Sequence, residues 1–260
     1  MSKKLYDDTF YNSQVDGSFR SAKVYAELLK SLLAPSSVAD LGCGRGTWLK
    51  AFAEAGATKL VGFDGSWNNQ DRMIDSRIHF IATDLNQPMP RGGSKFDLAV
   101  SLEVAEHLKR EASALFVQNI TSLSDAVLFG AAFINQGGTD HINEQCHSYW
   151  AQLFIENGYL PYDVFRPAVW GVSEVEFWYQ QNAFLYVKVE SVAAAKLEKS
   201  GYRPISNLEF MNCVHPDLLN IWVGKARHPI TALLKSSALK VMPRRFVGSA
   251  LALKKKLRVA

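Results

Sequence analysis

Short apolar runs recur along the first 190 residues, separated by polar and glycine-containing stretches. Seven of these runs have the length of β-strands: around 37–39, 59–63, 78–82, 96–102, 126–133, 159–165 and 183–189. They show little polar alternation, which is typical of strands covered by helices on both faces. Helical patterns lie between them, so the chain is predicted to form βαβ units around a mainly parallel sheet.

Apolar residues at helical spacing predict the helices of this α/β arrangement. One covers Val24 to Leu33 and ends before Pro35. A second follows a glycine-rich turn, and a third covers Ser148 to Asn157 and stops at Gly158. From Val192 onward the helical signals are weaker and interrupted by prolines. We therefore expect a core domain over residues 1–190, with its N-terminal helix as a lid, and a basic helical extension over residues 191–260.

The charge of the chain is unevenly distributed. The net charge is +4, yet the 43 residues after Asp217 contain ten Lys or Arg and no Asp or Glu. Residues 1–217 therefore carry a net charge of −6. The basic tail fits either an anionic partner or a solvated helix. Because apolar residues alternate with its cations, we expect at most a weak peripheral membrane contact. With no recognised nucleic-acid module, a nucleic-acid partner is not expected.

The remaining composition indicates a cytoplasmic protein. No apolar stretch reaches the ~18–20 residues of a membrane-spanning helix, and no apolar run of a secretory signal follows the first lysines. The three cysteines, Cys43, Cys146 and Cys213, are scattered without metal-ligand spacing. The oligomeric state is not predicted.

The most informative segment joins the first strand to the next helix and reads Val38-Ala39-Asp40-Leu41-Gly42-Cys43-Gly44-Arg45-Gly46. Its glycines allow a tight turn and a close approach of the backbone to a ligand. A nicotinamide site would read G-x-G-x-x-G and hold a pyrophosphate. Here the third glycine comes one residue early, and the carboxylate of Asp40 would repel a pyrophosphate. That carboxylate suits a ligand with an ammonium group and a sulfonium.

Two further acids follow the next two strands. Asp64 comes directly after the second strand, where a carboxylate can accept hydrogen bonds from both hydroxyls of a ribose. Asp84 and Leu85 follow the third strand, where an acid can bind an adenine amino group and an apolar neighbour can cover the ring. A lone aspartate would more often cap a loop or helix. Three acids at consecutive strand ends instead predict a ligand site at this edge of the sheet.

Two motifs resemble those of class I S-adenosylmethionine-dependent methyltransferases. The run from Asp40 to Gly46 is similar to their first motif, and Phe96-Asp97-Leu98-Ala99-Val100-Ser101-Leu102-Glu103-Val104-Ala105-Glu106-His107-Leu108 is similar to their fourth-strand motif. This resemblance, over residues 10–190, implies a Rossmann-like sheet of seven strands whose last strand is antiparallel, with helices on both faces. It also implies S-adenosyl-L-methionine as cofactor.

The resemblance further implies which residues contact the cofactor. They are Asp40, Gly42, Gly44, Trp48, Asp64, Asp84, Leu85, Ser101, Leu102 and Glu103. The first acid and the glycines would flank the methionine part, Asp64 the ribose, and Asp84 with Leu85 the adenine. Trp48 either walls this site or belongs to the core.

Three other stretches resemble, more narrowly, methyltransferases from bacterial capsule and O-antigen glycan clusters. They are Gly17-Ser18-Phe19-Arg20-Ser21-Ala22, Asp140-His141-Ile142-Asn143-Glu144-Gln145-Cys146-His147-Ser148-Tyr149-Trp150 and Trp178-Tyr179-Gln180-Gln181-Asn182. This resemblance implies O-methylation of a sugar, a nucleotide sugar or another small molecule of a glycan pathway. An N-methyltransferase of a small molecule and a non-catalytic cofactor-binding partner subunit remain alternatives.

Polar residues between positions 140 and 147 supply the candidate catalytic groups. They follow the fifth strand and so belong at the same sheet edge as the cofactor. A hydroxyl that attacks a methyl sulfonium must lose its proton, and a positioned histidine accelerates such a step ~10²–10⁴-fold. His141 is the first candidate for this base and His107 the second, with Glu144 completing the set. Asp140 and Glu144 offer oxygen ligands for Mg²⁺, but adjacent loop positions are weak evidence, so no metal site is predicted.

Overall fold

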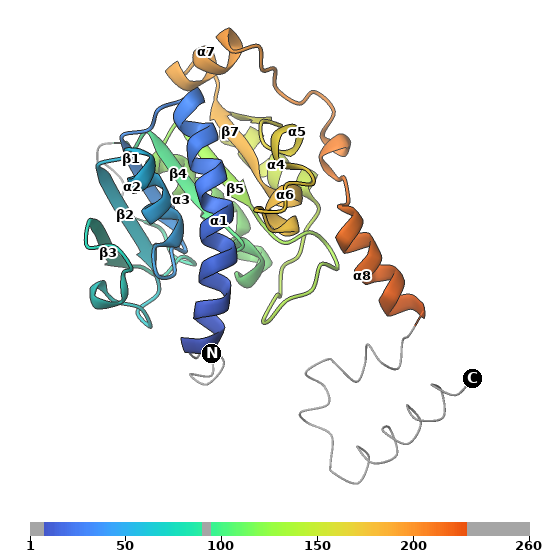
Figure 1. Ribbon diagram of the computed structural model, residues 1–260. Coiled ribbons are helices and arrows are strands. Elements are labelled where there is room, and N and C mark those ends of the chain that lie inside the picture. Colours follow the sequence, from blue (N-terminus) through green and yellow to red (C-terminus); the bar gives the residue numbers. More distant parts are fainter. Residues whose placement is uncertain (1–7, 90–94, 228–260) are drawn as a thin grey trace. The chain divides into compact units, whose positions relative to one another are not determined.

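The computed structural model describes residues 8–89 and 95–227, and a seven-stranded sheet forms its centre (Figure 1). The strands are β1 (Ser37–Leu41), β2 (Lys59–Asp64), β3 (Ile78–Ala82), β4 (Leu98–Leu102), β5 (Ala126–Gly130), β6 (Tyr159–Tyr162) and β7 (Phe184–Lys188). Their spatial order is β3-β2-β1-β4-β5-β7-β6. The first five strands pair in parallel, whereas β7 is antiparallel to both β5 and β6. The predicted sheet, including its antiparallel last strand, is confirmed.

Two apolar clusters cover the two faces of this sheet, because alternate residues of each strand point to opposite sides. On β4, Val100 belongs to one cluster and Ala99 to the other. The first cluster includes residues of α1 (Asp8–Leu32), α2 (Thr47–Ala55), α5 (Arg166–Val169), α6 (Phe177–Asn182) and α7 (Val192–Lys199). The second includes residues of α3 (Ser113–Leu123), α4 (His147–Glu156) and η4 (Leu208–Met211). This burial on both faces explains the unbroken apolar runs of the inner strands, whereas the edge strand β3 is partly exposed.

Some strands are shorter than their apolar runs. The fourth run begins at Phe96, which forms only an isolated bridge with Ser124, and β4 itself begins at Leu98. Between them, one carboxylate oxygen of Asp97 accepts hydrogen bonds from the backbone N–H and hydroxyl groups of Ser36 and Ser37. This network ties the start of β4 to the start of β1.

The long helix α1 packs against α2 and α6. Tyr25 Oη donates a hydrogen bond of 2.7 Å to the Tyr179 carbonyl, and Ser18 Oγ lies 3.0 Å from Tyr179 Oη. A Cβ on Gly17 would lie 2.4 Å from Glu176 Oε1, so glycine permits the close approach of the two segments. The first and third stretches of the glycan-cluster resemblance thus meet around Tyr179.

The chain divides into two compact units, residues up to Cys213 and residues from Val214. Leu197 of α7 is fully buried in the first unit, so part of the segment assigned to the extension packs with the core. The second unit contributes the described helix α8 (Pro216–Arg227). Most of the basic tail, on which the membrane prediction depends, lies outside the described residues. Among the helices that the structure does describe, none combines the length and apolarity needed to cross a membrane.

The remaining short helices lie in the loops that follow strands β2 and β4. They are η1 (Gln70–Arg72), η2 (Ala105–His107) and η3 (Arg110–Ala112). In the parallel part of the sheet these loops leave the carboxyl edge, where the candidate residues are concentrated.

Candidate functional site

The turn between β1 and α2 is built from glycines with left-handed backbone. Gly42, Gly44 and Gly46 have φ angles of +83°, +53° and +84°. A Cβ on Gly42 would lie 2.4 Å from Val104 Cγ2, and one on Gly46 would lie 2.5 Å from Ile78 Cδ1. A Cβ on Gly44 would have no neighbour within 4 Å. The protein therefore packs against the outer two glycines and leaves the backbone of Gly44 accessible to a ligand.

Asp64 and Asn68 fix this turn from the end of β2. The two carboxylate oxygens of Asp64 accept hydrogen bonds from the N–H groups of Gly44, at 2.8 Å, and Gly65, at 2.7 Å. Asn68 Nδ2 donates to the carbonyl of Gly44. Burial raises the pKa of Asp64, and these backbone donors offset part of the increase. The sequence analysis missed Asn68 because it lies in a polar loop with no pattern around it.

Asp40 lies beside Asp64 in the interior of the site. Its side chain is buried, with 3% of the residue exposed. Burial, and then the negative charge of Asp64, raise the pKa of Asp40 to about 8. A ligand cation beside a buried carboxyl with a raised pKa stabilises its ionised form. The accessible Gly44 backbone and the two acids therefore fit a ligand that carries an ammonium group and a ribose, as S-adenosyl-L-methionine does.

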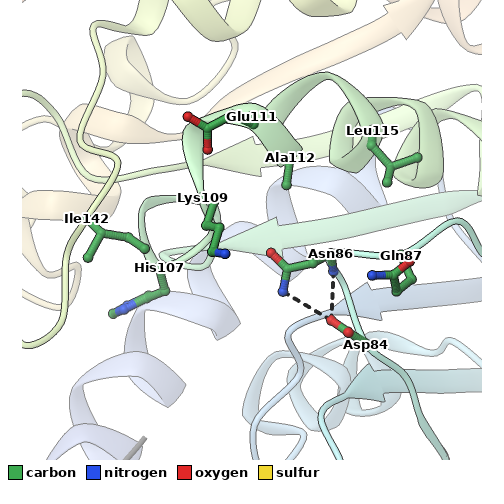
Figure 2. A pocket seen from close by; sticks show the side chains of 9 residues that line it. All are labelled: Asp84, Asn86, Gln87, His107, Lys109, Glu111, Ala112, Leu115 and Ile142. Carbon is green, nitrogen blue, oxygen red and sulfur yellow. Dashed lines mark hydrogen bonds between the residues drawn. The ribbon is translucent and has the colours of Figure 1, made fainter.

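The residues proposed to bind adenine, Asp84 and Leu85, lie in different environments. Asp84 is exposed, and its Oδ1 accepts hydrogen bonds from the backbone N–H and Nδ2 of Asn86. These donors lower the pKa of Asp84. Leu85 is buried in the second apolar cluster. Asp84 lines an open pocket of about 600 Å³ that extends to His107 and Ile142 (Figure 2).

Trp48 is largely buried within an aromatic group rather than presented to the pocket. Its ring lies edge-on to Tyr25 and Tyr179, with centroid distances of 5.5 and 5.1 Å. Only 7% of the residue is exposed, and it belongs to the first apolar cluster. These contacts fit the core alternative for Trp48, and a wall role toward the cofactor stays a prediction.

The end of β4 turns the chain sharply into the site. Ser101 Oγ donates to the Leu41 carbonyl at 2.9 Å and so joins β4 to β1 next to the glycine-rich turn. Leu102 is the buried last residue of the strand. Glu103 follows with a φ of +55°, which is unusual for a residue other than glycine.

Glu103 belongs to a polar network at this edge. Its carboxylate accepts hydrogen bonds from Asn182 Nδ2 at 2.9 Å and from Gln136 Nε2 at 3.0 Å. Burial raises the pKa of Glu103. Gln136 is a further residue that the sequence analysis missed, whereas Asn182 belongs to one of the resemblance stretches.

A second group of titratable residues forms where the segment after β5 meets η2. The N–H groups of Ile142 and Asn143 donate to the Glu106 carbonyl at 2.9 and 3.0 Å. Asn143 Nδ2 donates to Ser113 Oγ at 3.0 Å. These bonds hold residues 141–143 against η2 and bring His141 next to His107.

His141 is oriented by an acid on its own segment. Its Nδ1 lies 2.9 Å from Glu144 Oε1, while its Nε2 lies 3.9 Å from Glu106 Oε1. The Glu144 contact favours the tautomer with the proton on Nδ1, so Nε2 keeps a lone pair. The rings of His141 and His107 meet edge-to-face with centroids 4.8 Å apart. Thus the three predicted catalytic residues are brought together.

Glu106 is the most important residue that the sequence analysis did not single out. It is 0% exposed, and neither of its carboxyl oxygens has a hydrogen-bond partner among the described residues. Burial, and then the charge of Glu103, raise the pKa of Glu106 well above its usual value. The N–H groups of Glu106 itself and of Ala132 approach the carboxyl without reaching hydrogen-bond geometry, and they offset only part of this increase. Its signal in the sequence was its position three residues after Glu103 and directly before His107.

His107 carries a second unpartnered polar atom. Its Nδ1 is buried and has no hydrogen-bond partner within the described part of the chain. Burial, and then the neighbouring His141, lower the pKa of His107. Both effects favour the uncharged form of the ring.

His147, from the same polar run as His141, has a structural position instead. Its Nδ1 lies 2.8 Å from the Met211 carbonyl and its Nε2 lies 3.1 Å from Asn182 Oδ1. Burial lowers the pKa of His147 to about 4. Asp140, also from this run, is exposed.

Comparisons with known proteins support these observations. A family model described as a methyltransferase domain matches residues 11–170, which is more than half of the chain. No match to a curated protein was found.

Three solved structures are similar to this chain. An O-methyltransferase family protein from Burkholderia thailandensis has a TM-score of 0.52 at 12% identity, over 71% of this chain and 60% of that chain. The complex between the Haloferax volcanii Trm112 methyltransferase activator and the putative methyltransferase has a TM-score of 0.50 at 15% identity. The match covers 69% of this chain and 94% of that chain. Magnesium protoporphyrin IX methyltransferase from Synechocystis PCC 6803, with bound SAH, has a TM-score of 0.49 at 17% identity. The match covers 72% of this chain and 90% of that chain.

The family match, the order of the strands and the accessible glycine turn all agree. The chain belongs to the methyltransferase-domain family, whose cofactor is S-adenosyl-L-methionine.

Proposed function

We propose that this methyltransferase methylates a hydroxyl oxygen of a small molecule. The proposed acceptor is a sugar, a nucleotide sugar or another glycan precursor. The observation that carries this proposal is the pairing of His141 Nδ1 with Glu144 Oε1 at 2.9 Å. The pairing leaves the Nε2 lone pair available at the sheet edge where the cofactor residues also lie. A hydroxyl needs such a proton acceptor, whereas a neutral amine can attack before it loses a proton.

The residues proposed to hold the cofactor divide its parts among them. Asp40, Gly42 and Gly44 would hold the amino-acid part, Asp64 the ribose and Asp84 the adenine. When bound, the cofactor supplies an electrophilic methyl group on a sulfonium sulfur. The acceptor oxygen forms a bond to the methyl carbon, the carbon–sulfur bond breaks with its electron pair remaining on sulfur, and the hydroxyl proton passes to a base. Alignment of the two reactants contributes up to ~7–11 kcal/mol in favourable cases.

The polar character of the site supports a hydroxyl-rich acceptor. Glu103, Gln136 and Asn182 form one hydrogen-bonded network next to the histidines. Donors and acceptors held in this way suit the hydroxyl groups of a sugar. The resemblance to glycan-cluster methyltransferases supports the same class, because one of its three stretches contains His141 and Glu144.

Turnover with a panel of acceptors tests this function. Purified protein is incubated with S-adenosyl-L-methionine and either nucleotide sugars or amino-sugar analogues, and S-adenosylhomocysteine release is measured. We expect turnover with hydroxyl acceptors, and a kcat lowered roughly 10²-fold in His141→Ala with unchanged cofactor affinity. His79→Ala, which removes an exposed histidine from β3, serves as the matched control.

The alternatives give different results in the same assay. Methylation of the amine analogues alone would make the protein an N-methyltransferase. Cofactor binding without turnover on any acceptor would instead support a non-catalytic partner subunit.

A further inference from the structure

Three side chains of metal-ligand type converge at the acceptor end of the site. Glu106, His107 and His141 each offer one ligand atom, and these atoms all lie within 4.8 Å of one another. They come from η2 and from the segment after β5. Because the N–H groups of Ile142 and Asn143 bond to the Glu106 carbonyl, the two segments are fixed relative to each other. The convergence is therefore a feature of the backbone and not of one flexible side chain.

The buried members of this group lack partners within the described residues. Both carboxyl oxygens of Glu106, which is 0% exposed, and Nδ1 of His107 have no hydrogen bond there. Buried polar groups are nearly always hydrogen-bonded, and an unpaired buried carboxylate is costly. A cation bound between these atoms would satisfy them together.

We propose that Glu106, His107 and His141 bind a divalent first-row transition-metal ion at the methyl-acceptor site. Two imidazoles and one carboxylate suit Mn²⁺, Fe²⁺ or Zn²⁺ better than Mg²⁺, which prefers an all-oxygen environment. With only three protein ligands, such an ion keeps open coordination positions. A substrate oxygen can bind there. The sequence had offered only Asp140 and Glu144 as oxygen ligands, and neither belongs to the convergent group.

Glu144 has the position of an outer-sphere partner for such a site. It accepts a hydrogen bond from His141 Nδ1 at 2.9 Å, and its Oε1 also accepts one from the Gly137 N–H at 2.7 Å. Histidines that bind metals commonly donate their second N–H to a carboxylate, which fixes the tautomer and the ring. The arrangement leaves Nε2, the atom nearer Glu106, as the ligand.

The ligand atoms need only a modest movement to enclose an ion. Ligands at ~2.1 Å from one ion lie about 3 Å apart, whereas His141 Nε2 and Glu106 Oε1 are 3.9 Å apart. The contraction is about 1 Å for this pair and up to about 2 Å for atoms as far apart as 4.8 Å, which is within the reach of side-chain rotation. The ring of His141 also lies directly over Gly138, where a Cβ would be 2.2 Å from Nε2. Glycine at this position thus leaves room for the ligand ring.

The role of the ion rests on the proposed function. A bound hydroxyl has a lower pKa on a divalent ion, so the acceptor's proton would pass to water. His141 and His107 then act as ligands, in place of the base role considered above. Of the three proposed ligands, His107 also lines the open pocket that contains Asp84 (Figure 2).

Metal binding is tested directly on the full-length protein, without turnover. Protein freed of metal with EDTA and dialysed is titrated with Mn²⁺ by calorimetry, and the absorption spectrum of its Co²⁺ form is recorded. We expect one ion per chain. Glu106→Gln and His141→Asn should weaken Mn²⁺ binding more than 10-fold, and Glu144→Gln about 10–100-fold. His79→Asn, which changes an exposed histidine elsewhere, should bind Mn²⁺ as the wild type does.

The affinity for S-adenosylhomocysteine is measured on the same preparations and reports whether each variant is folded. If Glu106→Gln does not fold, His141→Asn and Glu144→Gln test the same site from less buried positions. Folded wild-type protein without saturable 1:1 binding of Mn²⁺ or Co²⁺ would overturn the proposal, and so would variants with wild-type affinity. Full turnover by metal-free protein would overturn the catalytic role and return His141 to that of a base. If wild-type protein binds Mn²⁺ but does not bind S-adenosylhomocysteine, the result would contradict the methyltransferase function and leave the metal site standing.

Discussion

Two acidic residues of this protein, Asp64 at the end of β2 and Glu106 after β4, lie at the same edge of the sheet but have opposite surroundings. Asp64 accepts hydrogen bonds from two backbone N–H groups, of Gly44 and Gly65. Glu106 is more deeply buried, and no described residue donates a hydrogen bond to its carboxyl group. Asp64 is thus satisfied by the protein itself, whereas Glu106 and Nδ1 of His107 are left unpaired within the described residues.

The difference indicates how the two regions obtain their shape. Around Asp64 the protein orders the glycine turn before any ligand arrives, which lowers the entropic cost of binding. Around Glu106 the protein retains an unfavourable burial that a bound proton or cation would relieve. Proteins keep such conflicts mainly at functional sites. The acceptor region is therefore where bound species should change stability most.

The largest expected effect on stability comes from Gly42→Ala, in the glycine turn that Asp64 holds in place. The left-handed backbone costs about 1–2 kcal/mol for alanine, and the clash with Val104 adds about 1–3 kcal/mol. We expect the free energy of unfolding, measured with urea, to fall by about 2–5 kcal/mol. Gly201→Ala is the matched control, because Gly201 has a φ of +86° and no neighbour within 4 Å of an added Cβ. Equal losses in the two variants would show that the turn is not tightly packed.

A pair of amide substitutions compares the two acids directly, in metal-free protein. Asp64→Asn should lower the free energy of unfolding by about 1–3 kcal/mol, because the amide leaves a backbone donor unpaired. Glu106→Gln should raise it by about 1 kcal/mol, because an amide of the same shape is buried without the proton uptake that the raised pKa of Glu106 implies at neutral pH. Urea unfolding of both variants checks the signs. If both changes destabilise the protein, Glu106 has partners that complete its site and the contrast fails.

The smallest expected effect concerns the protonation of Asp40. With a pKa of about 8, this carboxyl is mostly protonated at pH 7 in the free protein. An ammonium group bound beside it would favour the ionised form, so binding of S-adenosylhomocysteine should release up to one proton. The complex holds fewer protons than the free protein, and affinity should therefore rise with pH up to about 8, by at most ~1.4 kcal/mol per unit. Calorimetry in buffers of different ionisation enthalpy measures the release.

Asp40→Asn provides the control for this proton release. The variant should bind S-adenosylhomocysteine with an enthalpy that does not depend on the buffer. An unchanged buffer dependence in Asp40→Asn would assign the proton to another group.

The sequence by itself determined the sheet and predicted the cofactor side of the site. Strands buried on both faces leave unbroken apolar runs, so their number and order along the chain were readable. Asp40 and Asp64 were readable for a related reason, since each belongs to the end of a strand and parallel strand ends share one edge. The glycine turn needed only neighbouring residues to be recognised. All of these signals are local.

The tertiary structure alone decided the acceptor side. His141 and His147 lie six residues apart in one polar run, yet the first faces Glu106 and the second begins α4 and points to Met211 and Asn182. Likewise, nothing local shows that Glu106 is buried without a donor. Its environment is created by a segment about 35 residues away in the sequence, which crosses η2 and removes it from water. Burial and pairing of this kind depend on long-range contacts, which a pattern of neighbouring residues does not contain.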